Sequence, residues 1–398
     1  MNYKNTMRAC CMACVVQAIV VNYAPLLFLT FQSTYSLRLQ QITLLVTVNF
    51  LTQLLVDFLV SRFADRIGYR RCIIASHIFA AVGLAGLAVL PELFPTPMSG
   101  LLAATIIYAI GSGIIEVLNS PLAEACPTPN KEAAMTGLHS FYSWGCVLTI
   151  LGSTILFAVF GIENWKWICC FWAVAPLLNA IAFARVPMAP IVAEGKAMSM
   201  KELLKEKVFW MVIVAIICAG AAEQAVSQWA SAFAERGLQV SKTVGDLAGP
   251  CMFAVLMGLA RMLHGKIAHR VSMETCMIFS SALCVFSYIL TVLPVHPVVN
   301  LFGCGLSGFA VGVLWPGALS VAAKRCPRGG TVMFAFLALG GDAGCSLGPT
   351  VVGLVSGRFG DNLKTGLLAA MLFPAVIFAV ILVLKRQDHV KKTRDFAH

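Results

Sequence analysis

The strongest constraint on this chain is a series of twelve long apolar runs that follow one another from end to end. A helix needs roughly 20 mostly apolar residues to cross a bilayer. Backbone groups in lipid must bond within their own segment, so each run is predicted to be helical. The runs lie near residues 8–30, 42–62, 72–90, 99–123, 132–159, 165–185, 208–233, 245–263, 273–293, 297–322, 331–357 and 363–384. Only 12% of the 398 residues are charged, against about 25% in soluble domains. We therefore predict an all-α membrane protein with twelve transmembrane helices.

The distribution of Lys and Arg predicts the orientation of these helices. If both termini are cytoplasmic, the outer segments hold only six of the 29 Lys and Arg residues, namely Arg38, Lys166, Arg236, Lys242, Arg358 and Lys364. Cytoplasmic loops are the basic ones in membrane proteins. This placement accounts for the net charge of +11 without a nucleic acid partner. We expect a bacterial-type inner or plasma membrane, and a first apolar run that is retained because no small-residue cleavage site follows it.

The two halves of the chain resemble each other weakly at an offset of 199 residues. Gly145-Cys146 aligns with Gly344-Cys345, and Gly161 aligns with Gly360. Six helices per repeat predict two bundles related by an axis along the membrane normal. The predicted parts are an N-terminal bundle at 1–186, a cytoplasmic linker at 187–207 and a C-terminal bundle with a basic tail at 208–398. In the linker, Ser199 to Glu202 form a capping box that opens a short amphipathic helix. We expect a monomer.

The loop after the second run, from Ser61 to Arg71, carries the most specific short motif. It reads Ser-Arg-Phe-Ala-Asp-Arg-Ile-Gly-Tyr-Arg-Arg. It resembles the signature loop of the major facilitator superfamily, Gly-x-x-x-Asp-Arg-x-Gly-Arg-Arg, with Ser61 in place of the first glycine. In that family the loop latches the halves in one conformation, and Gly68 here suits the tight turn. The residues expected to form the latch are Asp57, Asp65, Arg66, Gly68, Arg70 and Arg71. The matching loop in the second half, Arg261 to Lys266, has no Asp, so a latch there is expected to be weaker.

The fourth run narrows this resemblance to one branch. The segment from Gly111 to Pro121 resembles the Gly-x-Gly-x-x-Glu-x-x-x-Asn-Pro helix of the fucose:proton symporter branch, with Ser120 inserted before the proline. The segment from Leu138 to Gly145 resembles the next helix of that branch. The resemblance implies two six-helix bundles around a central cavity and alternating access. It also implies a sugar-like substrate that moves together with H⁺ or Na⁺.

Acidic residues inside the apolar runs are the candidates for coupling. An ionisable side chain at the bilayer centre costs at least ~2.5 kcal/mol, so it needs a function or a partner. Glu116, Glu223 and Asp342 lie within the predicted fourth, seventh and eleventh helices. A carboxyl that crosses the membrane neutral and releases its proton on the other side couples transport to a proton gradient. Glu223 is alternatively a cation ligand.

Amide and aromatic side chains in the same runs are the candidates for substrate binding. An amide offers a donor and an acceptor to a sugar hydroxyl, and an indole can stack on the apolar face of a sugar ring. Gln224 and Gln228 are four residues apart and share one face of a continuous helix. The candidates are Asn22, Asn119, His139, Tyr142, Trp144, Gln224, Gln228, Trp229 and Trp315. Asn49 and Gln53, also four apart, are expected to bond neighbouring helices to each other.

Two other functions stay open on the sequence. The first is a proton-coupled efflux antiporter of the same fold, although Gly145 to Gly152 contains no proline of the kind that antiporters of the superfamily carry there. The second is a sensor that binds a solute without moving it. The Gly-x-Ser-Gly of rhomboid-type proteases occurs at Gly305 to Gly308, but no His follows Ser307 before His389 to serve as a base. We therefore predict neither an enzyme nor a bound cofactor, and the cysteine spacing indicates no metal site.

Overall fold

The computed structural model describes residues 3–128, 131–189, 200–267, 270–293, 296–326 and 328–395. These residues form helices and no strand. Twelve stretches of the described chain are long and apolar enough to cross a membrane. The predicted all-α fold with twelve spans is confirmed.

The chain divides into two compact units, each described here by itself. Unit 1 comprises Met1–Ala193 and Gln228–Val255, and unit 2 comprises Glu194–Ser227 and Leu256–His398. Unit 1 thus contains a short segment from the second half of the sequence. The predicted domain boundaries at 186 and 208 stay a prediction.

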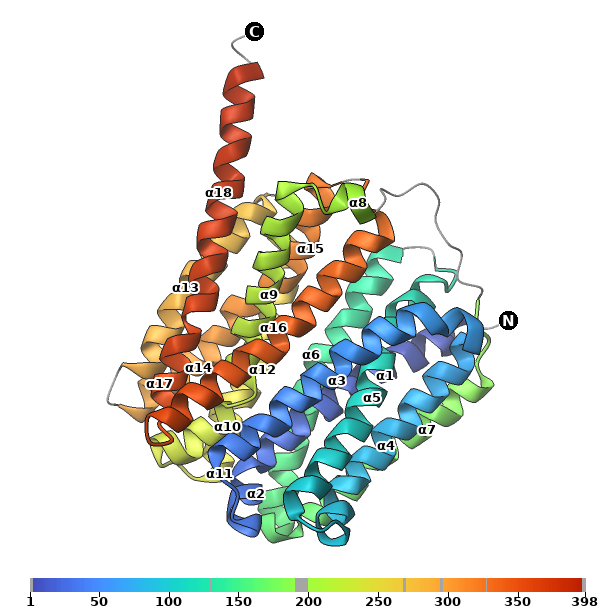
Figure 1. The fold of residues 1–398 in the computed structure, drawn as a ribbon, viewed down its shortest axis with the longest axis vertical. Helices are drawn as coiled ribbons and strands as arrows, with labels where there is room; N and C mark the ends of the chain where they lie inside the picture. The colour runs from blue at the N-terminus through green and yellow to red at the C-terminus, as the bar shows by residue number, and fades with distance from the viewer. Residues whose placement is uncertain are drawn as a thin grey trace. The chain divides into compact units, whose positions relative to one another are not determined.

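In unit 1, helix α4 lies between α5 and α7, while α1 packs on α5, α6 and α7 (Figure 1). The helices of its first part are α1 (Tyr3–Tyr23), η1 (Ala24–Leu27), α2 (Phe28–Tyr35), α3 (Leu39–Ile67), α4 (Tyr69–Leu93), α5 (Pro97–Glu124), α6 (Lys131–Phe160), η2 (Ile162–Asn164) and α7 (Trp165–Arg185). The later segment adds α10 (Ala230–Ala232), the π-helix η3 (Phe233–Gly237), α11 (Lys242–Asp246) and the π-helix η4 (Leu247–Cys251).

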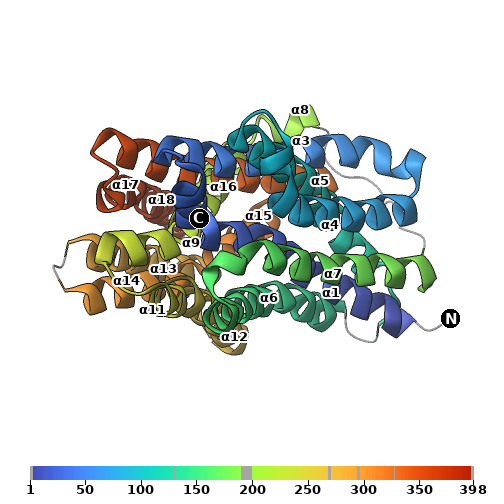
Figure 2. The same cartoon turned by 90° about the horizontal axis from the view of Figure 1, so that it is seen from below.

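In unit 2, helix α9 packs along α16 and also contacts α15 and α18, as the labels in Figures 1 and 2 help to trace. Its helices are α8 (Met200–Leu203), α9 (Lys207–Ser227), α12 (Met252–Ile267, which begins in unit 1), α13 (Met273–Val292), α14 (Pro297–Val311), α15 (Leu314–Arg325), α16 (Gly330–Arg358), α17 (Leu363–Ala370) and α18 (Leu372–Asp395). The short linker helix appears as α8, and Ser199 of its predicted capping box lies outside the described residues.

Glycines let α9 and α16 touch backbone to backbone. A Cβ at Gly344 would overlap the carbonyl oxygen of Ile217, and one at Gly348 would overlap that of Ala221. From the other side, a Cβ at Gly220 would press on the Gly341 carbonyl. Small residues three and four apart are the usual means of close helix packing in membranes. We call this contact the glycine seam.

Some predicted helices are not continuous. The run predicted at 208–233 ends as regular helix at Ser227, and residues Gln228 and Trp229 form a turn. The first run is interrupted by η1, where Pro25 supplies no backbone N–H. The tenth run breaks at residues 312–313, between α14 and α15. These interruptions correct the prediction of unbroken helices.

Candidate functional site

Two carboxylates from different helices meet inside unit 1. A carboxylate oxygen of Asp57 on α3 lies within 4.8 Å of one of Glu116 on α5. Asp57 is buried and Glu116 is half-buried. The Gln17 side chain of α1 donates a hydrogen bond from Nε2 to Glu116 Oε2 at 3.0 Å. Both acids lie within membrane spans, so the structure brings two acidic groups together where one alone is already costly.

Close packing of α3 on α5 permits this approach. Gly113 faces α3, and a Cβ there would lie 3.1 Å from Asp57 Oδ1. Gln53 lies one turn before Asp57 on α3. Its Oε1 accepts a hydrogen bond from the Ser112 hydroxyl of α5 at 3.3 Å, and its Nε2 donates to Asn49 Oδ1 at 3.1 Å. The predicted role in joining helices is confirmed for Gln53, whereas Asn49 accepts its hydrogen bond from Gln53 on the same helix. Sequence analysis assigned Asp57 to the latch, and it did not anticipate that this side chain lies beside Glu116.

The amides predicted to bind substrate in unit 1 hold helices together in this conformation. Asn119 on α5 donates to the Cys10 carbonyl of α1 at 3.0 Å and to Cys14 Sγ at 3.1 Å. Asn22 on α1 donates to Cys146 Sγ of α6 at 3.2 Å. Both amides are buried. Their donors are engaged, so binding a solute would require these helix contacts to be exchanged.

The three candidates on α6 differ in exposure. His139 is exposed and Tyr142 is half-buried. Trp144 is 45% exposed, on a face with other exposed large apolar side chains, including Phe141 and Leu148. A continuous apolar face of this kind suits lipid, so Trp144 is the weakest candidate for a sugar contact.

Glu223 of unit 2 has a cationic neighbour. Arg261 on α12 places Nη2 3.7 Å from Glu223 Oε2 and donates from Nε to the Gly312 carbonyl at 3.1 Å. Gln224 donates to Glu223 Oε1 at a long 3.5 Å. Sequence analysis placed Arg261 in the second-half counterpart of the signature loop and did not anticipate its contact with Glu223. An acid that faces an arginine has a charged partner, which favours its ionised form.

Gln228 and Trp229 occupy the turn after α9 and belong to unit 1. Gln228 donates to the Val21 carbonyl at 3.3 Å. Trp229 is fully buried and packs on Phe28, with ring centroids 5.5 Å apart. The helical spacing that was used to place Gln224 and Gln228 on one face therefore ends at Ser227, and that argument was wrong.

Asp342 and Trp315 lie in unit 2, on α16 and α15. Asp342 is buried, and Trp315 is half-buried. A Cβ at Gly341 would overlap the Trp315 ring, and one at Gly220 would lie 3.1 Å from it. The indole therefore covers one edge of the glycine seam, next to the position of Asp342.

A small pocket in unit 1 adjoins Gln228. Its polar lining comes from Asn49, Thr105, Tyr108 and Gln228, among apolar side chains such as Phe28. Its inner volume is about 10 Å³, which accommodates about one water molecule. A sugar does not fit this pocket in the conformation described.

Two charged clusters were not anticipated from the sequence. In unit 1, Lys242 and Asp246 of α11 form a salt bridge at 3.1 Å. In unit 2, the buried Glu274 at the start of α13 accepts a hydrogen bond from Lys324 Nζ at 2.8 Å and lies 3.6 Å from Arg325 Nη2. The i,i+4 spacing of Lys242 and Asp246 was the available signal for the first cluster. The second joins helices some 50 residues apart in sequence, without a local signal.

Comparison with known proteins decides the family. The Major Facilitator Superfamily profile matches residues 9–349, most of the chain. The chain belongs to this superfamily. The predicted family is thus confirmed, and the protein is a multi-pass membrane transporter with the major facilitator fold. No curated protein sequence matches significantly.

Solved structures of superfamily members share the fold. A bacterial homolog of the human lysosomal transporter Spinster, inward-facing and unoccupied, has 14% identity and a TM-score of 0.76, covering 97% of this chain and 98% of its own. A D-xylose-proton symporter has 11% identity and a TM-score of 0.75, with 96% and 97% covered. The Escherichia coli fucose:proton symporter has 14% identity and a TM-score of 0.66, with 96% and 99% covered. At these identities the likeness concerns the fold.

The signature segment from Ser61 to Arg71 comprises the end of α3, Gly68 at the turn, and the start of α4. Gly68 has φ +96°, a conformation that glycine adopts at little cost, so the predicted glycine turn is confirmed. Arg70 donates to three carbonyls at the end of α7, those of Phe183 at 2.7 Å, Ala184 at 3.0 Å and Val186 at 2.8 Å. Arg66 and Arg71 are exposed, and the Asp65 side chain lies outside the described residues. The latch role of these residues stays a prediction.

Proposed function

We propose that this transporter takes up a small polar solute of the monosaccharide or polyol class, together with a proton, by alternating access. The observation that carries the proposal is the pairing of Asp57 and Glu116 within 4.8 Å inside the membrane spans of unit 1. Two carboxylates at this separation repel each other when both are ionised, and one shared proton removes the repulsion. The pair then titrates as a unit.

A shared proton explains how the pair can serve transport. With one proton bound, the pair carries a single negative charge, and the Gln17 amide already donates to Glu116. Binding a second proton makes the pair neutral, which lowers the cost of moving it through an apolar environment. Release on the other side restores the charge. The proposal therefore assigns the proton to Glu116 and Asp57, and leaves Glu223 to its neighbour Arg261.

A sugar-like solute is supported by the chemistry of the polar side chains and by fold relatives. The amides of Asn22, Asn119, Gln224 and Gln228 would offer donors and acceptors to a solute once their present contacts are exchanged, and Trp315 would offer a ring for stacking. Two of the solved relatives are a fucose:proton symporter and a D-xylose-proton symporter. The Spinster homolog has a comparable TM-score, so the fold is equally compatible with other solutes, and efflux by antiport stays the alternative.

Purified protein in proteoliposomes tests this proposal. We would impose an inward proton gradient and measure the uptake of labelled monosaccharides, polyols and organic acids, with internal pH recorded by a trapped dye. Accumulation of a sugar with simultaneous acidification of the interior supports the proposal. Accumulation of a solute only against an outward proton flux would establish antiport instead, and solute binding without accumulation would establish a sensor.

A further inference from the structure

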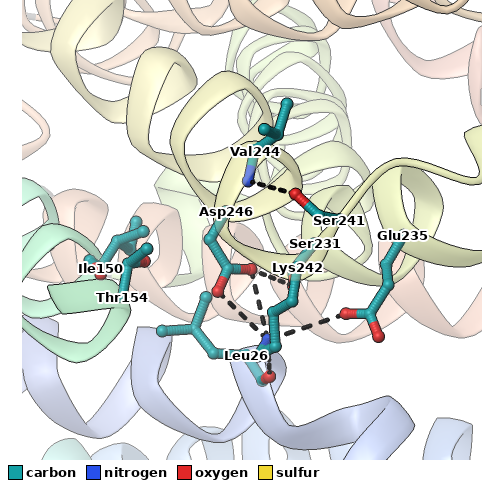
Figure 3. A network of polar contacts seen from close by, with 9 residues as sticks. All are labelled: Leu26, Ile150, Thr154, Ser231, Glu235, Ser241, Lys242, Val244 and Asp246. Carbon is teal, nitrogen blue, oxygen red and sulfur yellow. Dashed lines mark hydrogen bonds and ion pairs between the residues drawn. The ribbon is translucent and has the colours of Figure 1, made fainter. Parts of the chain in front are cut away.

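A second charged cluster lies in unit 1, far along the sequence from the Asp57–Glu116 pair. Figure 3 shows it at α11, with Ser231 from α10, Glu235 from η3, Thr154 from α6 and Leu26 from η1 around Lys242 and Asp246. The distribution of Lys and Arg in the sequence predicts that this end of the helices lies outside. We call Lys242, Asp246 and Glu235, with the groups they contact, the outer cluster.

Lys242 joins the segment Gln228–Val255 to the N-terminal helices. Its ammonium donates to the Leu26 carbonyl at 2.6 Å and lies 3.1 Å from Asp246 Oδ2. It also lies 5.4 Å from the centre of the Phe157 ring on α6, within the range of a cation–π interaction. One cation thus makes contacts with η1, α6 and its own helix. Figure 3 shows the contacts with Leu26 and Asp246.

Asp246 holds Lys242 in this position. Its side chain is 1% exposed. Ser231 donates to Asp246 Oδ1 at 2.5 Å, and the Thr154 hydroxyl lies beside the same carboxylate. A buried ion pair of this kind contributes little net stability compared with apolar side chains of similar volume, because both charges lose their hydration. Its best-attested use is to specify one conformation or to act as a switch.

The segment that carries the outer cluster is set off by helix interruptions at both ends. Regular helix stops at Ser227, and the π-helix η4 with Pro250 precedes α12. Short π-helices occur often at functional sites, and hinges are a few residues at the ends of elements. The segment also contacts the first helices through Gln228 with Val21 and Trp229 with Phe28. The segment therefore packs on the N-terminal helices within unit 1, and it is continuous in sequence with α9 and α12 of unit 2.

We propose that residues 228–251 form the outer gate of the transporter, and that the Lys242–Asp246 pair locks this gate closed on Leu26 and Phe157 until a proton from outside neutralises Asp246. Protonation removes the negative charge that holds the ammonium. Lys242 then loses its buried counterion and is more stable in water, so the contact with Leu26 opens. The proposal rests on the proposed function, because an outer gate matters only for a transporter.

Glu235 supplies the entry point for that proton. It lies 3.9 Å from Lys242 and its side chain is 32% exposed, so it faces both solvent and the cluster. Burial raises the pKa of Glu235 above its usual range, Lys242 lowers it, and Asp246 raises it again. The charged and titratable groups that face Asp246 in the described chain are Lys242, Glu235 and, from η4, Cys251. Arg236 of η3 reaches instead toward Gln32 of α2, at 3.4 Å.

Hydrogen exchange of the purified, solute-free protein tests the lock. For Asp246→Asn at about pH 7.5, we expect exchange of peptides covering 24–35 and 228–246 to speed up by about tenfold or more. In the wild type the same change is expected only as the pH is lowered, after correction for intrinsic exchange rates. Peptides from α4 and α5 should not change in either case. Faster exchange spread equally over α4 and α5, or no change at 24–35 and 228–246, would overturn the proposal.

Two further variants keep the test decisive. Lys242→Met/Asp246→Leu replaces the ion pair by apolar side chains and is expected to fold and to lose the pH response of the gate peptides. If that response survives, the lock is wrong, even should Asp246→Asn fail to fold. Glu92→Gln breaks the exposed pair with Lys166 at the ends of α4 and α7 and should behave like the wild type. Because no solute is present, a failed solute screen refutes the proposed function without affecting this result, and the reverse also holds.

Discussion

Two pairs of charged side chains that are wholly or partly buried in the membrane spans of unit 1 differ in the sign of their members. Asp57 and Glu116 are both acids, from α3 and α5. Lys242 and Asp246 are a base and an acid on one helix. The charges of the ammonium and the ionised carboxylate cancel, so this pair is neutral while Asp246 is unprotonated. The acid pair becomes neutral only by binding protons, whereas the mixed pair becomes charged by binding one. The same external proton therefore relaxes one pair and disrupts the other.

This contrast links the two proposals. A proton that opens the outer cluster can go on to load the acid pair, so the gate would open when the coupling site is about to be filled. Substitutions at either pair test this contrast, and their expected effects on transport and stability differ in size and in kind.

The largest effect is expected for Glu116→Gln. The amide keeps the size of the side chain and its contact with Gln17, but it cannot release a proton. Gradient-driven accumulation should fall to passive equilibration, while exchange of labelled for unlabelled solute continues. Both are measured in proteoliposomes with the solute found in the screen. Concentrative uptake at the wild-type level would exclude Glu116 as the coupling group.

Asp57→Asn should have a smaller effect and a different signature. It removes the repulsion between the two acids, so Glu116 needs a lower pH to hold its proton. We expect the pH of half-maximal transport to move down by about 1–2 units, with accumulation reduced rather than lost. Transport measured across external pH reports this shift. An unchanged pH profile would show that the two carboxylates do not titrate together.

The third effect concerns stability rather than transport. Lys242→Met leaves the buried Asp246 carboxylate without its cation, which should cost about 3–5 kcal/mol of unfolding free energy. Lys242→Met/Asp246→Leu should recover most of this loss, because no charge remains buried. Melting temperatures of the purified variants measure both. Equal losses in the single and double variants would mean that packing, and not the charge, dominates at this position.

Glu235→Gln should give the smallest effect, seen in the pH dependence of stability. Since the pKa of Glu235 is raised in the folded state, the folded protein binds more protons than the unfolded chain between the ordinary and the raised pKa. Stability from this group is therefore complete at low pH and decreases as the pH rises through that window. The variant should flatten this part of the melting-temperature profile. An identical profile in the variant would contradict the raised pKa.

The fold was largely predictable because lipid imposes one strong rule. Each span needs about 20 apolar residues, and this pattern is visible without knowledge of any contact. The turn at Gly68 was predictable for a similar reason, since few other residues adopt its backbone conformation. The break at Gln228 was not, because neither Gln nor Trp disfavours a helix strongly. At this break the structure shows a tertiary contact, the packing of Trp229 on Phe28, which no local sequence pattern indicates.

The candidate site was less predictable than the fold. Glu116 was singled out correctly as an acid inside a span, but its neighbour Asp57 lies 59 positions earlier in the sequence, and no local pattern links them. Asn119 and Trp229 were expected to meet a solute, and they instead make buried contacts with α1 and α2. Polar side chains in a membrane serve packing and binding with the same chemistry, so residue type alone does not separate the two uses. The binding roles stay predictions.

The glycine seam between α9 and α16 restricts the route of the solute. Where Ile217 and Ala221 present their carbonyls directly to Gly344 and Gly348, no side chain could move aside to make room for a hydrated molecule. A transported solute is therefore expected to pass along other faces of these two helices. Any side chain larger than hydrogen at 344 or 348 would push α9 and α16 apart.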